Sequence, residues 1–232
     1  MRFSFPSSDM AAVYMSLAAA GDMGANTAPA DARQEFFRIT GAAVPPLVLE
    51  QIHSRIILDS QEVRAAADAG RRLLKGDGII TGDRASMAVS ISDCVPIFLL
   101  DTRTGAAGAF HSGWRGTGIA AEGVLRMEKE FGSRREDIEA LIGPAIGGCC
   151  YEVSADLYDQ FLRDHGSEGL RRSNNKYYLD LKKINYLILS ELNLKNIKIC
   201  DYCTYCDHRF FSCRRSGSPV FPRMLAYIRF LE

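Results

Sequence analysis

Alternation of apolar and polar residues is clearest in the middle of the chain. Residues 89–92 alternate with a period of two, which is typical of a strand with one buried face. Residues 95–100 are continuously apolar and run into the polar segment 101–105, so a buried strand followed by a tight turn is predicted. Residues 106–110 form a second apolar run that ends at His111. The pattern therefore predicts neighbouring strands with a histidine at the end of the last one.

Helical spacing of apolar residues follows a glycine-rich bend after His111 and predicts a helix over 119–131. Ser133 to Glu136 has the spacing of a capping box and predicts a short helix. The remaining predicted elements are helices near Asp31–Arg38, after Ser154 and over 181–188, and strands at 141–142 and 196–200. Strands and helices intermingle without a strict βαβ rhythm, so the predicted class is α+β. We expect one domain over residues 1–232, in which residues 1–48 are atypical because loop signals dominate them.

Composition narrows the classes of function. Basic and acidic residues are equal in number, 28 each, which gives no electrostatic case for binding nucleic acid. No segment approaches the roughly 20 apolar residues that a membrane span needs, and the N-terminus does not resemble a signal peptide. Seven cysteines, an odd count in apolar or metal-like contexts, fit a reduced compartment better than a disulfide framework. A cytoplasmic protein is therefore expected.

Three residues in separate segments form a candidate metal site. His53 and Cys94 are each ambiguous alone, because lone histidines and buried cysteines are usually structural. His111 is more telling, because it stands where an apolar strand meets a glycine-rich loop. One thiolate and two imidazoles suit Zn²⁺, and three protein ligands leave a fourth position open for water. Such a site activates water at neutral pH, so we expect a catalytic zinc.

At this point the sequence resembles the laccase-domain family, whose members are named multicopper polyphenol oxidases or purine nucleoside phosphorylases. Five motifs in register carry the resemblance from about residue 50 to the C-terminus. They are Gln51–Ser54, Ser92–Pro96, His111–Gly116, Gly143–Ile146 with Tyr151–Val153, and Phe210–Arg215. The family's opening Ser-Thr-Arg segment has no counterpart before residue 48, and its late Thr-Gly-Arg-Met pattern reads Phe221-Pro-Arg-Met224 here.

The resemblance implies a fold, an activity and a site. The implied fold is a mixed β-sandwich packed with helices, and the implied metal ligands are His53, Cys94 and His111. The implied activity is phosphorolysis of purine nucleosides and methylthioadenosine, with adenosine deamination at the same site. The expected partners are thus a small-molecule nucleoside and phosphate, with no nucleic acid and no membrane, in a monomer or weak homo-oligomer. Gln51 is a candidate for substrate contact.

Arginines near these motifs are candidates for phosphate binding, because a guanidinium matches phosphate bidentately. Arg115 is bracketed by glycines and a tryptophan, which favours function. Arg214 and Arg215 are equally consistent with a solvated surface pair. Asp93, beside Cys94, either orients a ligand or acts as an acid or base, or it caps a turn.

The remaining cysteines raise the question of a second metal. Cys200, Cys203 and Cys206 have C-x2-C-x2-C spacing, and with Cys213 they suggest a second zinc or an iron–sulfur cluster. The family resemblance accounts for Cys203 and Cys206 without a metal. The adjacent pair Cys149–Cys150 is interpreted as structural.

Three other functions compete with the zinc phosphorylase. A copper polyphenol oxidase follows the family's older name, but multicopper oxidases need more histidines than the four in this chain. Copper at one site remains open, because copper binds such ligands more tightly than zinc. A thiol hydrolase would use Cys94 as nucleophile and His111 as base, a role that a metal on the thiolate would block. The last alternative is a zinc-stabilised interaction module, against which the open coordination position argues.

Overall fold

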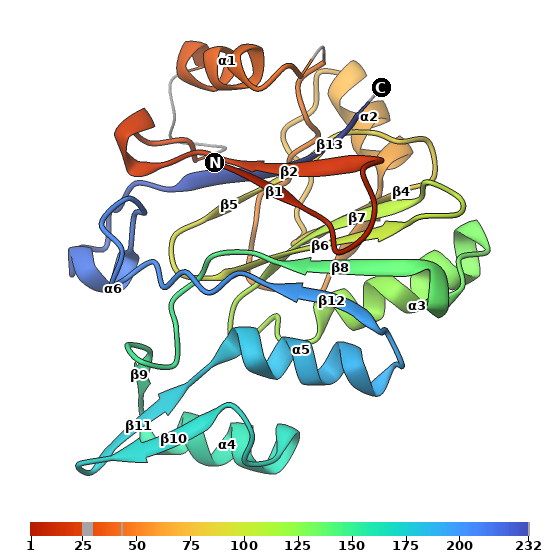
Figure 1. Cartoon of the computed structure of the whole chain (residues 1–232). Coiled ribbons are helices and arrows are strands. Elements are labelled where there is room, and N and C mark those ends of the chain that lie inside the picture. The colour runs from red at the N-terminus through yellow and green to blue at the C-terminus, as the bar shows by residue number, and fades with distance from the viewer. Residues whose placement is uncertain (25–29, 43, 232) are drawn as a thin grey trace.

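Two β-sheets packed face to face form the centre of the molecule, with helices on both outer faces (Figure 1). The computed structural model describes residues 1–24, 30–42 and 44–231. The first sheet is antiparallel, in the order β1-β2-β13-β5, with bounds Arg2–Ser4, Ala11–Met15, Met224–Phe230 and Met87–Ile91. The second is mixed, in the order β12-β8-β6-β7-β4-β3, with bounds Asn196–Ile199, Ile138–Ile142, Val95–Asp101, Ala107–Ser112, Gly78–Thr81 and Ile57–Asp59. The prediction of an α+β fold with a mixed β-sandwich core flanked by helices is confirmed.

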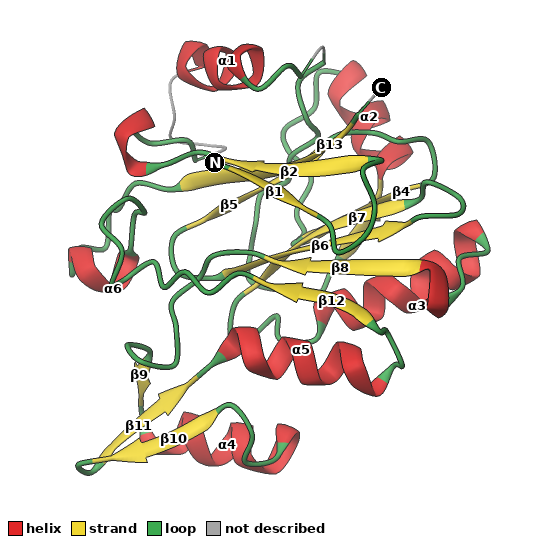
Figure 2. Cartoon of the chain, in the orientation of Figure 1, coloured by secondary structure: helices red, strands yellow, loops and turns green. Residues whose placement is uncertain are grey.

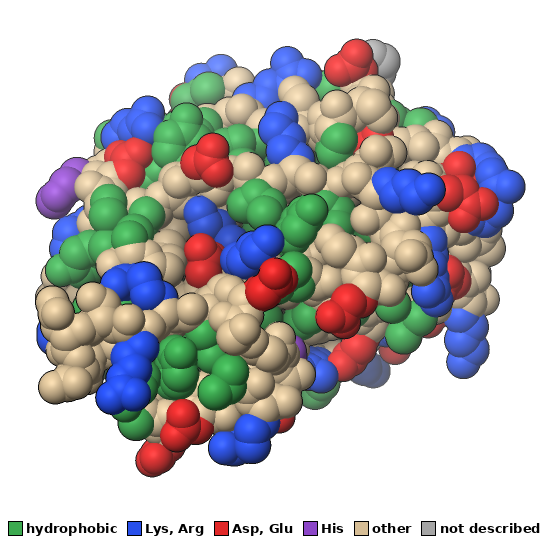
Figure 3. All heavy atoms as spheres, turned by 60° about the horizontal axis from the view of Figure 1, so that its bottom comes forward, with side chains coloured by type: hydrophobic (Ala, Val, Ile, Leu, Met, Phe, Trp, Pro, Cys, Tyr) green, Lys and Arg blue, Asp and Glu red, His purple; other side chains and the backbone are tan. Residues whose placement is uncertain are grey.

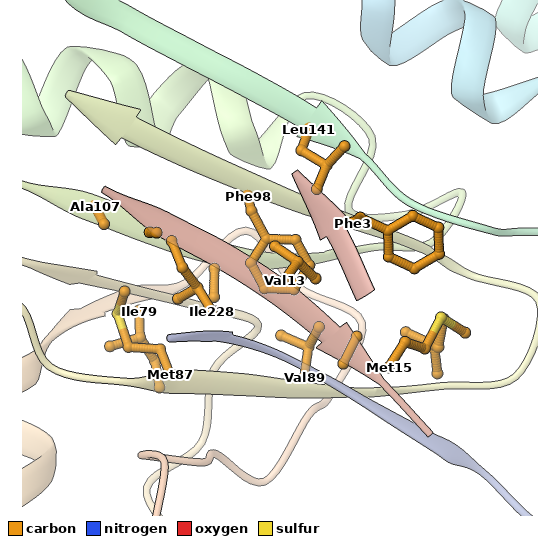
Figure 4. Packing of buried hydrophobic residues seen from close by; sticks show 14 of the residues in the cluster. Phe3, Val13, Met15, Ile79, Met87, Val89, Phe98, Ala107, Leu141 and Ile228 are labelled. Carbon is orange, nitrogen blue, oxygen red and sulfur yellow. The ribbon is translucent and has the colours of Figure 1, made fainter. Parts of the chain in front are cut away.

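The continuous apolar run of β6 is explained by burial on both of its faces. Successive side chains of a strand point to opposite sides. Phe98 packs between the two sheets, near residues of the four-stranded sheet such as Ile228 (Figure 4). Leu100 belongs to the same core cluster. Ile97 and Leu99 belong to a second core on the other side of the six-stranded sheet. Each fully buried side chain of this size contributes about 1.5–3 kcal/mol through the hydrophobic effect.

Helices cover both outer faces of the sandwich. Their bounds are Ala30–Ile39 for α1, Ser60–Asp68 for α2, Ile119–Phe131 for α3, Ala155–His165 for α4, Leu181–Glu191 for α5 and Cys213–Ser216 for α6. α3 and α5 pack on the six-stranded sheet, and α1 packs through Phe37 on Leu225 and Tyr227 of the four-stranded sheet. A small sheet of β10 (Leu170–Ser173), β11 (Lys176–Leu179) and β9 (Glu152–Val153) lies beside α4 (Figure 2).

Most helices predicted from the sequence are present. α1 matches the helix expected near Asp31–Arg38, α3 spans the predicted 119–131, and the Ser154 side chain caps α4 by accepting from the backbone N–H of Leu157. A short helix does follow Ser133, but the capping box that predicted it is absent. It is a 3-10 helix at Arg135–Asp137, and no side-chain hydrogen bond caps its first residue.

The surface agrees with the balanced composition. Acidic and basic side chains are interspersed on the face that Figure 3 shows. Among the helices of residues 1–24, 30–42 and 44–231, none has the length and apolar character that a membrane crossing requires.

Candidate metal centre

His53, Cys94 and His111 converge at one end of the sandwich. Their ligating atoms all lie within 4.8 Å of one another, and the two imidazole ring centres are 4.8 Å apart. A tetrahedral zinc ion with bonds of about 2.0–2.3 Å holds its ligand atoms about 3.3–3.8 Å apart. The three side chains therefore need only small adjustments to hold one ion. The donor set, one thiolate and two imidazoles, fits zinc.

Strand register explains why Cys94 and His111 meet. β6 and β7 are antiparallel, and Pro96 lies opposite His111 in their ladder. Cys94 precedes Pro96 by two residues, so it projects from the same face and is a diagonal neighbour of His111. This is the face that carries Phe98 into the core between the sheets. The site thus forms where that core opens at the strand ends.

Asp77 holds His53 and His111 in place and is fully buried. It precedes β4, whose first residue pairs with Phe110, so Asp77 lies next to His111. Its carboxylate lies 2.9 Å from Nδ1 of His111. Nε2 is therefore the ring nitrogen of His111 that is left for a metal ion. The same carboxylate accepts the backbone N–H groups of His53 at 3.0 Å and Ser54 at 2.6 Å. These bonds retain His53 at a φ of 58°, an uncommon backbone conformation for a residue other than glycine.

The charges of the three groups stabilise one another. Burial raises the pKa of the Cys94 thiol, but the charges and hydrogen bonds of His111 and then His53 lower it to about 6. Burial lowers the pKa of His111, yet the Cys94 thiolate and then Asp77 raise it to about 9. Burial also raises the pKa of Asp77, but hydrogen bonds from His111 and Ser54 bring it to about 2. Cys94 is therefore held as the thiolate, the form that binds metals, and metal binding would release the proton of His111.

Gly113 leaves room for the ligands. A side-chain carbon at this position would lie 3.1 Å from the Cys94 sulfur and 3.2 Å from Cδ2 of His53. Even the smallest side chain would therefore press on two of the three ligands. This close approach gives a physical reason for one glycine of the bend that follows β7.

Replacing Asp77 with asparagine is expected to lower zinc affinity by about 10–100-fold, the usual cost of losing a carboxylate behind a histidine ligand. The reason is that the amide keeps the shape of the side chain but not the charge that orients His111. Competition with a chromogenic zinc chelator measures the effect. Asp83→Asn, at a carboxylate that pairs with Arg64 instead, is the control. Unchanged affinity in Asp77→Asn would show that Asp77 supports only the fold.

Two cavities meet at the metal ligands. The smaller, of about 130 Å³, is lined by Leu49, Gln51, His53, Ser90, Ser92, Cys94, His111, Phe221 and Arg223. The larger, of about 220 Å³, is lined by His53, Ser92, Asp93, Cys94, Trp114, Ile146, Tyr151, Leu181, Cys213, Arg214 and Phe221. Four residues line both, namely His53, Ser92, Cys94 and Phe221. The smaller cavity has a mixed polar and apolar lining, the larger one is mostly apolar, and the candidate metal site lies between them.

The predicted phosphate-binding arginines have different surroundings. Arg115 is exposed, lies 4.6 Å from the ring centre of Trp114, and lines neither cavity. Arg215 donates to the backbone carbonyls of Thr204, Tyr205 and Phe210, which gives it a structural task. Arg214 lines the larger cavity and donates to the carbonyl of Glu152 at 2.6 Å. Of the three, only Arg214 reaches the site.

Gln51 lines the smaller cavity, but its amide is already paired. It donates to the carbonyl of Ser90 at 2.8 Å and accepts from the Ser90 N–H at 2.7 Å. The side chain thus ties the loop that carries His53 to β5. A substrate that contacts Gln51 would have to share the amide group with these two hydrogen bonds to Ser90.

Asp93 binds the C-terminal segment of the chain. Its carboxylate accepts the hydroxyl of Thr204 at 2.6 Å, the hydroxyl of Ser212 at 3.0 Å and the backbone N–H of Arg214 at 2.7 Å. The side chain is buried and its backbone φ is 86°. These contacts fit the turn-capping alternative, because the carboxylate bonds to the backbone and hydroxyl groups of the C-terminal segment. They also hold Arg214 at the larger cavity.

Asp93→Ala is expected to reduce the free energy of unfolding by about 3 kcal/mol, because it removes a buried charged acceptor with three partners. Urea denaturation measures the change, and Asp159→Ala, at an exposed position of α4, is the matched control. Full stability with lost turnover would instead support an acid–base role for Asp93.

Sequence reasoning missed two residues that the structure places at the site. Asp77 stands between two glycines, directly before the apolar start of β4, and an acid at the edge of a buried strand was the available signal. Arg223 lines the smaller cavity and is the arginine of the Phe221–Met224 segment. Its signal was the Arg-Met pair that this segment shares with the family pattern.

The second-metal set proposed from the sequence is wrong in two of its members. Cys200 is buried in the core between the sheets, and Cys213 lines the larger cavity. Neither lies with Cys203 and Cys206. The spacing rule failed because the chain turns into the core at Cys200, at the end of β12.

Comparisons with known proteins agree with this geometry. The family described as multi-copper polyphenol oxidoreductase laccase matches residues 10–231. A purine nucleoside phosphorylase of Clostridium acetobutylicum is 35% identical over 185 residues, which cover 78% of this chain and 75% of that protein. The adenosine deaminase RL5, from an unknown prokaryotic organism, is 31% identical over 200 residues, which cover 81% and 76%.

A solved structure extends the agreement to the fold. The crystal structure of YlmD from Geobacillus stearothermophilus superimposes with a TM-score of 0.84 at 29% identity, covering 97% of this chain and 93% of that one. The family match includes most of residues 1–48, which the sequence motifs had not reached. Because the family model matches residues 10–231 and a relative is 35% identical over 78% of the chain, this chain belongs to the multi-copper polyphenol oxidoreductase laccase family.

Proposed function

We propose that this protein is a zinc-dependent purine nucleoside phosphorylase that also deaminates adenosine and accepts methylthioadenosine. The observation that carries the proposal is the convergence of His53, Cys94 and His111 at the junction of two cavities. Relatives named purine nucleoside phosphorylase and adenosine deaminase support the substrate class.

The two cavities suit the two reactants of phosphorolysis. In this reaction a phosphate oxygen attacks C1′ of the ribose while the bond from C1′ to the base nitrogen breaks. Phosphate and base must therefore lie on opposite sides of the sugar. We place the base in the larger cavity, against Trp114, Tyr151 and Phe221, and the phosphate in the smaller one. The ribose then lies at the shared residues, beside the metal ligands.

Arg223 is the phosphate-binding residue in this arrangement. It is a cation that lines the smaller cavity, and none of the ion pairs within the described ranges involves its guanidinium. Its backbone N–H donates to the Asp22 carboxylate at 2.8 Å, which holds the Arg223 backbone in place. Its guanidinium lies 5.0 Å from the ring centre of Phe221. A phosphate there would form charge-assisted hydrogen bonds with a group that is otherwise stacked.

Ser92 offers a polar contact at the junction. Its hydroxyl is buried, lines both cavities, and has no hydrogen-bond partner among the residues that the structure describes. A buried hydroxyl without a partner costs free energy, which a bound ligand recovers. We assign Ser92 to a hydroxyl of the ribose.

A zinc ion held by His53, Cys94 and His111 would supply a Lewis acid and lower the pKa of water at that position. The protein's own contribution is orientation. Asp77 fixes the ring of His111 and the backbone of His53, and Gly113 gives the ligands room. Deamination exchanges the amino group at C6 of adenine for the oxygen of water, with release of ammonia. It requires the base to reach the junction in a second orientation.

Copper chemistry of the multicopper kind lacks the ligands here. Several copper ions need many histidines, and the chain has four. Among the histidines in the described part of the chain, only His53 and His111 belong to a group with metal-binding spacing.

A thiol hydrolase would use Cys94 as its nucleophile and His111 as its base. The metal content of the active protein separates that function from a zinc-dependent phosphorylase.

The products test the proposal. With adenosine and phosphate, the zinc-loaded protein is expected to release adenine and ribose 1-phosphate, and without phosphate it is expected to release inosine and ammonia. Mass spectrometry of the reaction mixture detects all four. Consumption of none of adenosine, inosine and methylthioadenosine would refute the proposed function.

A further inference from the structure

Four cysteines outside the proposed active site gather into one cluster. The sulfur atoms of Cys149, Cys150, Cys203 and Cys206 all lie within 4.8 Å of one another. The Cys206 sulfur is 3.2 Å from that of Cys150 and 3.8 Å from that of Cys149. A zinc ion with four Zn–S bonds of about 2.3 Å holds its sulfur atoms about 3.8 Å apart. The cluster therefore has the dimensions of a tetrahedral four-thiolate site.

The backbone around the cluster is arranged to bring two distant segments together. Ala145 and Cys203 form a β-bridge, and Thr204 N–H donates to the carbonyl of Ala145 at 3.1 Å. A turn then places both adjacent cysteines on one side, with the N–H of Cys150 donating to the carbonyl of Gly147 at 2.9 Å. The pairing of these segments is thus a property of the fold and does not depend on the sulfur atoms alone.

Gly147 is fitted to the sulfur atoms. Its N–H donates to the sulfur of Cys203 at 3.2 Å, a contact that favours a thiolate. A side-chain carbon at Gly147 would lie 3.1 Å from the sulfur of Cys149 and 3.5 Å from that of Cys203. A side chain here would therefore press on the sulfur of Cys149 and touch that of Cys203. The backbone thus both opens space for four sulfur atoms and donates to one of them.

We propose that Cys149, Cys150, Cys203 and Cys206 bind a second zinc ion, as a structural site with four thiolate ligands. Four protein ligands close the coordination sphere, so this site has no position for substrate. Arg171 donates to the carbonyls of Gly148 at 3.2 Å and Cys149 at 3.5 Å, and its positive charge offsets part of the negative charge of the four thiolates.

The second zinc ion would act on the active site through the segment that it fixes. Ile146 and Tyr151, on either side of the paired cysteines, line the larger cavity. Thr204, between the other two ligands, donates its hydroxyl to Asp93 at 2.6 Å. Cross-linking residues 149–150 to 203–206 thus holds the wall of the cavity in place. The site is a structural support for the pocket and takes no part in the chemistry.

Zinc suits the cluster better than other thiol chemistry. A four-iron cluster lies between its four thiolates and spreads them further than the separations seen here. Disulfides would join the cysteines in pairs. They would not explain why the Gly147 N–H donates to the Cys203 sulfur, or why all four sulfur atoms lie so close together. Tetrahedral sulfur sites of this size bind zinc or a single iron. Elemental analysis decides between these two metals.

The first test counts zinc per chain in protein purified under reducing conditions. We expect about two zinc ions in the native chain, one in Cys94→Ala, one in the double variant Cys203→Ser/Cys206→Ser, and two in the control Cys200→Ala. Four alternative results each overturn the proposal. They are one zinc ion in the native chain that is lost in Cys94→Ala, unchanged zinc in the double variant, iron in place of zinc, and a mass deficit of two hydrogens that marks a disulfide within the cluster.

A second measurement holds even if the double variant does not fold. Metal-free Cys94→Ala, which lacks one ligand of the proposed active site, is titrated with Co²⁺. Four thiolates bound to one cobalt ion are expected to give a strong sulfur-to-metal absorption that saturates at one equivalent. Absence of that absorption in the folded protein overturns the proposal, whatever the double variant does. Neither measurement depends on nucleoside turnover, so the second zinc site and the proposed function stand or fall separately.

Discussion

Replacing Cys94 with alanine is expected to reduce nucleoside turnover by about 10³-fold or more, which corresponds to about 4 kcal/mol of lost transition-state stabilisation. The variant removes the only sulfur ligand of the candidate site and leaves two imidazoles, one of which is on an exposed loop residue. The fold should persist, because Cys94 lies at the edge of the core and the sheets pack without it. Initial rates with adenosine, together with zinc content and a thermal unfolding curve, measure the three effects.

Cys200→Ala is the matched control, because it removes a cysteine that belongs to neither sulfur-containing metal group of the described residues. It should keep turnover within about threefold while losing some stability, since Cys200 is buried. Retained turnover in zinc-free Cys94→Ala would contradict a catalytic metal. Failure of Cys94→Ala to fold in the presence of zinc would make the site structural.

Arg223→Ala is expected to separate the two activities. Phosphorolysis should fall by about 10²-fold, because the variant loses a charge-assisted contact of about 1.5–3 kcal/mol that strengthens as the phosphate attacks. Deamination uses water in place of phosphate and should change by less than about threefold. Rates of adenine release and of inosine formation, measured on the same preparation across phosphate concentrations, give both values.

Arg163→Ala, at an exposed arginine of α4 that lines neither cavity, should leave both rates unchanged. Arg223→Lys keeps the charge but loses the planar fork, so phosphorolysis should recover only in part. Equal loss of both activities in Arg223→Ala would show that Arg223 shapes the cavity and does not bind phosphate. Loss of phosphorolysis in Arg214→Ala alone would move the phosphate to the larger cavity.

Much of the sheet that carries the site could be predicted, because its signals are local. The apolar run of β6, the turn after it and the apolar run of β7 are contiguous in sequence. Once they pair as a hairpin, the period of two places Cys94 and His111 on one face. The α3 helix was found for the same reason, since its apolar stripe repeats over 13 residues.

The first strands could not be predicted, because their partners are remote. β1 and β2 are short, and β2 pairs with β13 more than 200 residues later. Nothing within residues 1–48 signals that pairing. The helix α1 was accessible, since its sequence is amphipathic, but the sheet that it covers was not.

The same distinction between local and remote signals applies to the candidate sites. Asp77 acts by contacting His53 and His111 from a third segment, and only the ladder between β4 and β7 brings it there. The cysteine cluster pairs residues about 55 positions apart through the bridge at Ala145. Spacing rules therefore matched Cys203 with Cys206 but added Cys200 and Cys213 in place of Cys149 and Cys150. Motif spacing finds ligands that are adjacent in sequence, whereas contacts between strands determine the rest.

Metal dependence of turnover tests the central claim most directly. Protein stripped with a chelator under reducing conditions is assayed with adenosine and phosphate, and again after stepwise addition of zinc. We predict no turnover in the stripped protein, recovery as zinc is restored, and no recovery in Cys94→Ala carried through the same steps. Full turnover by the metal-free protein, or recovery in Cys94→Ala equal to that of the native chain, would contradict a catalytic zinc ion at His53, Cys94 and His111.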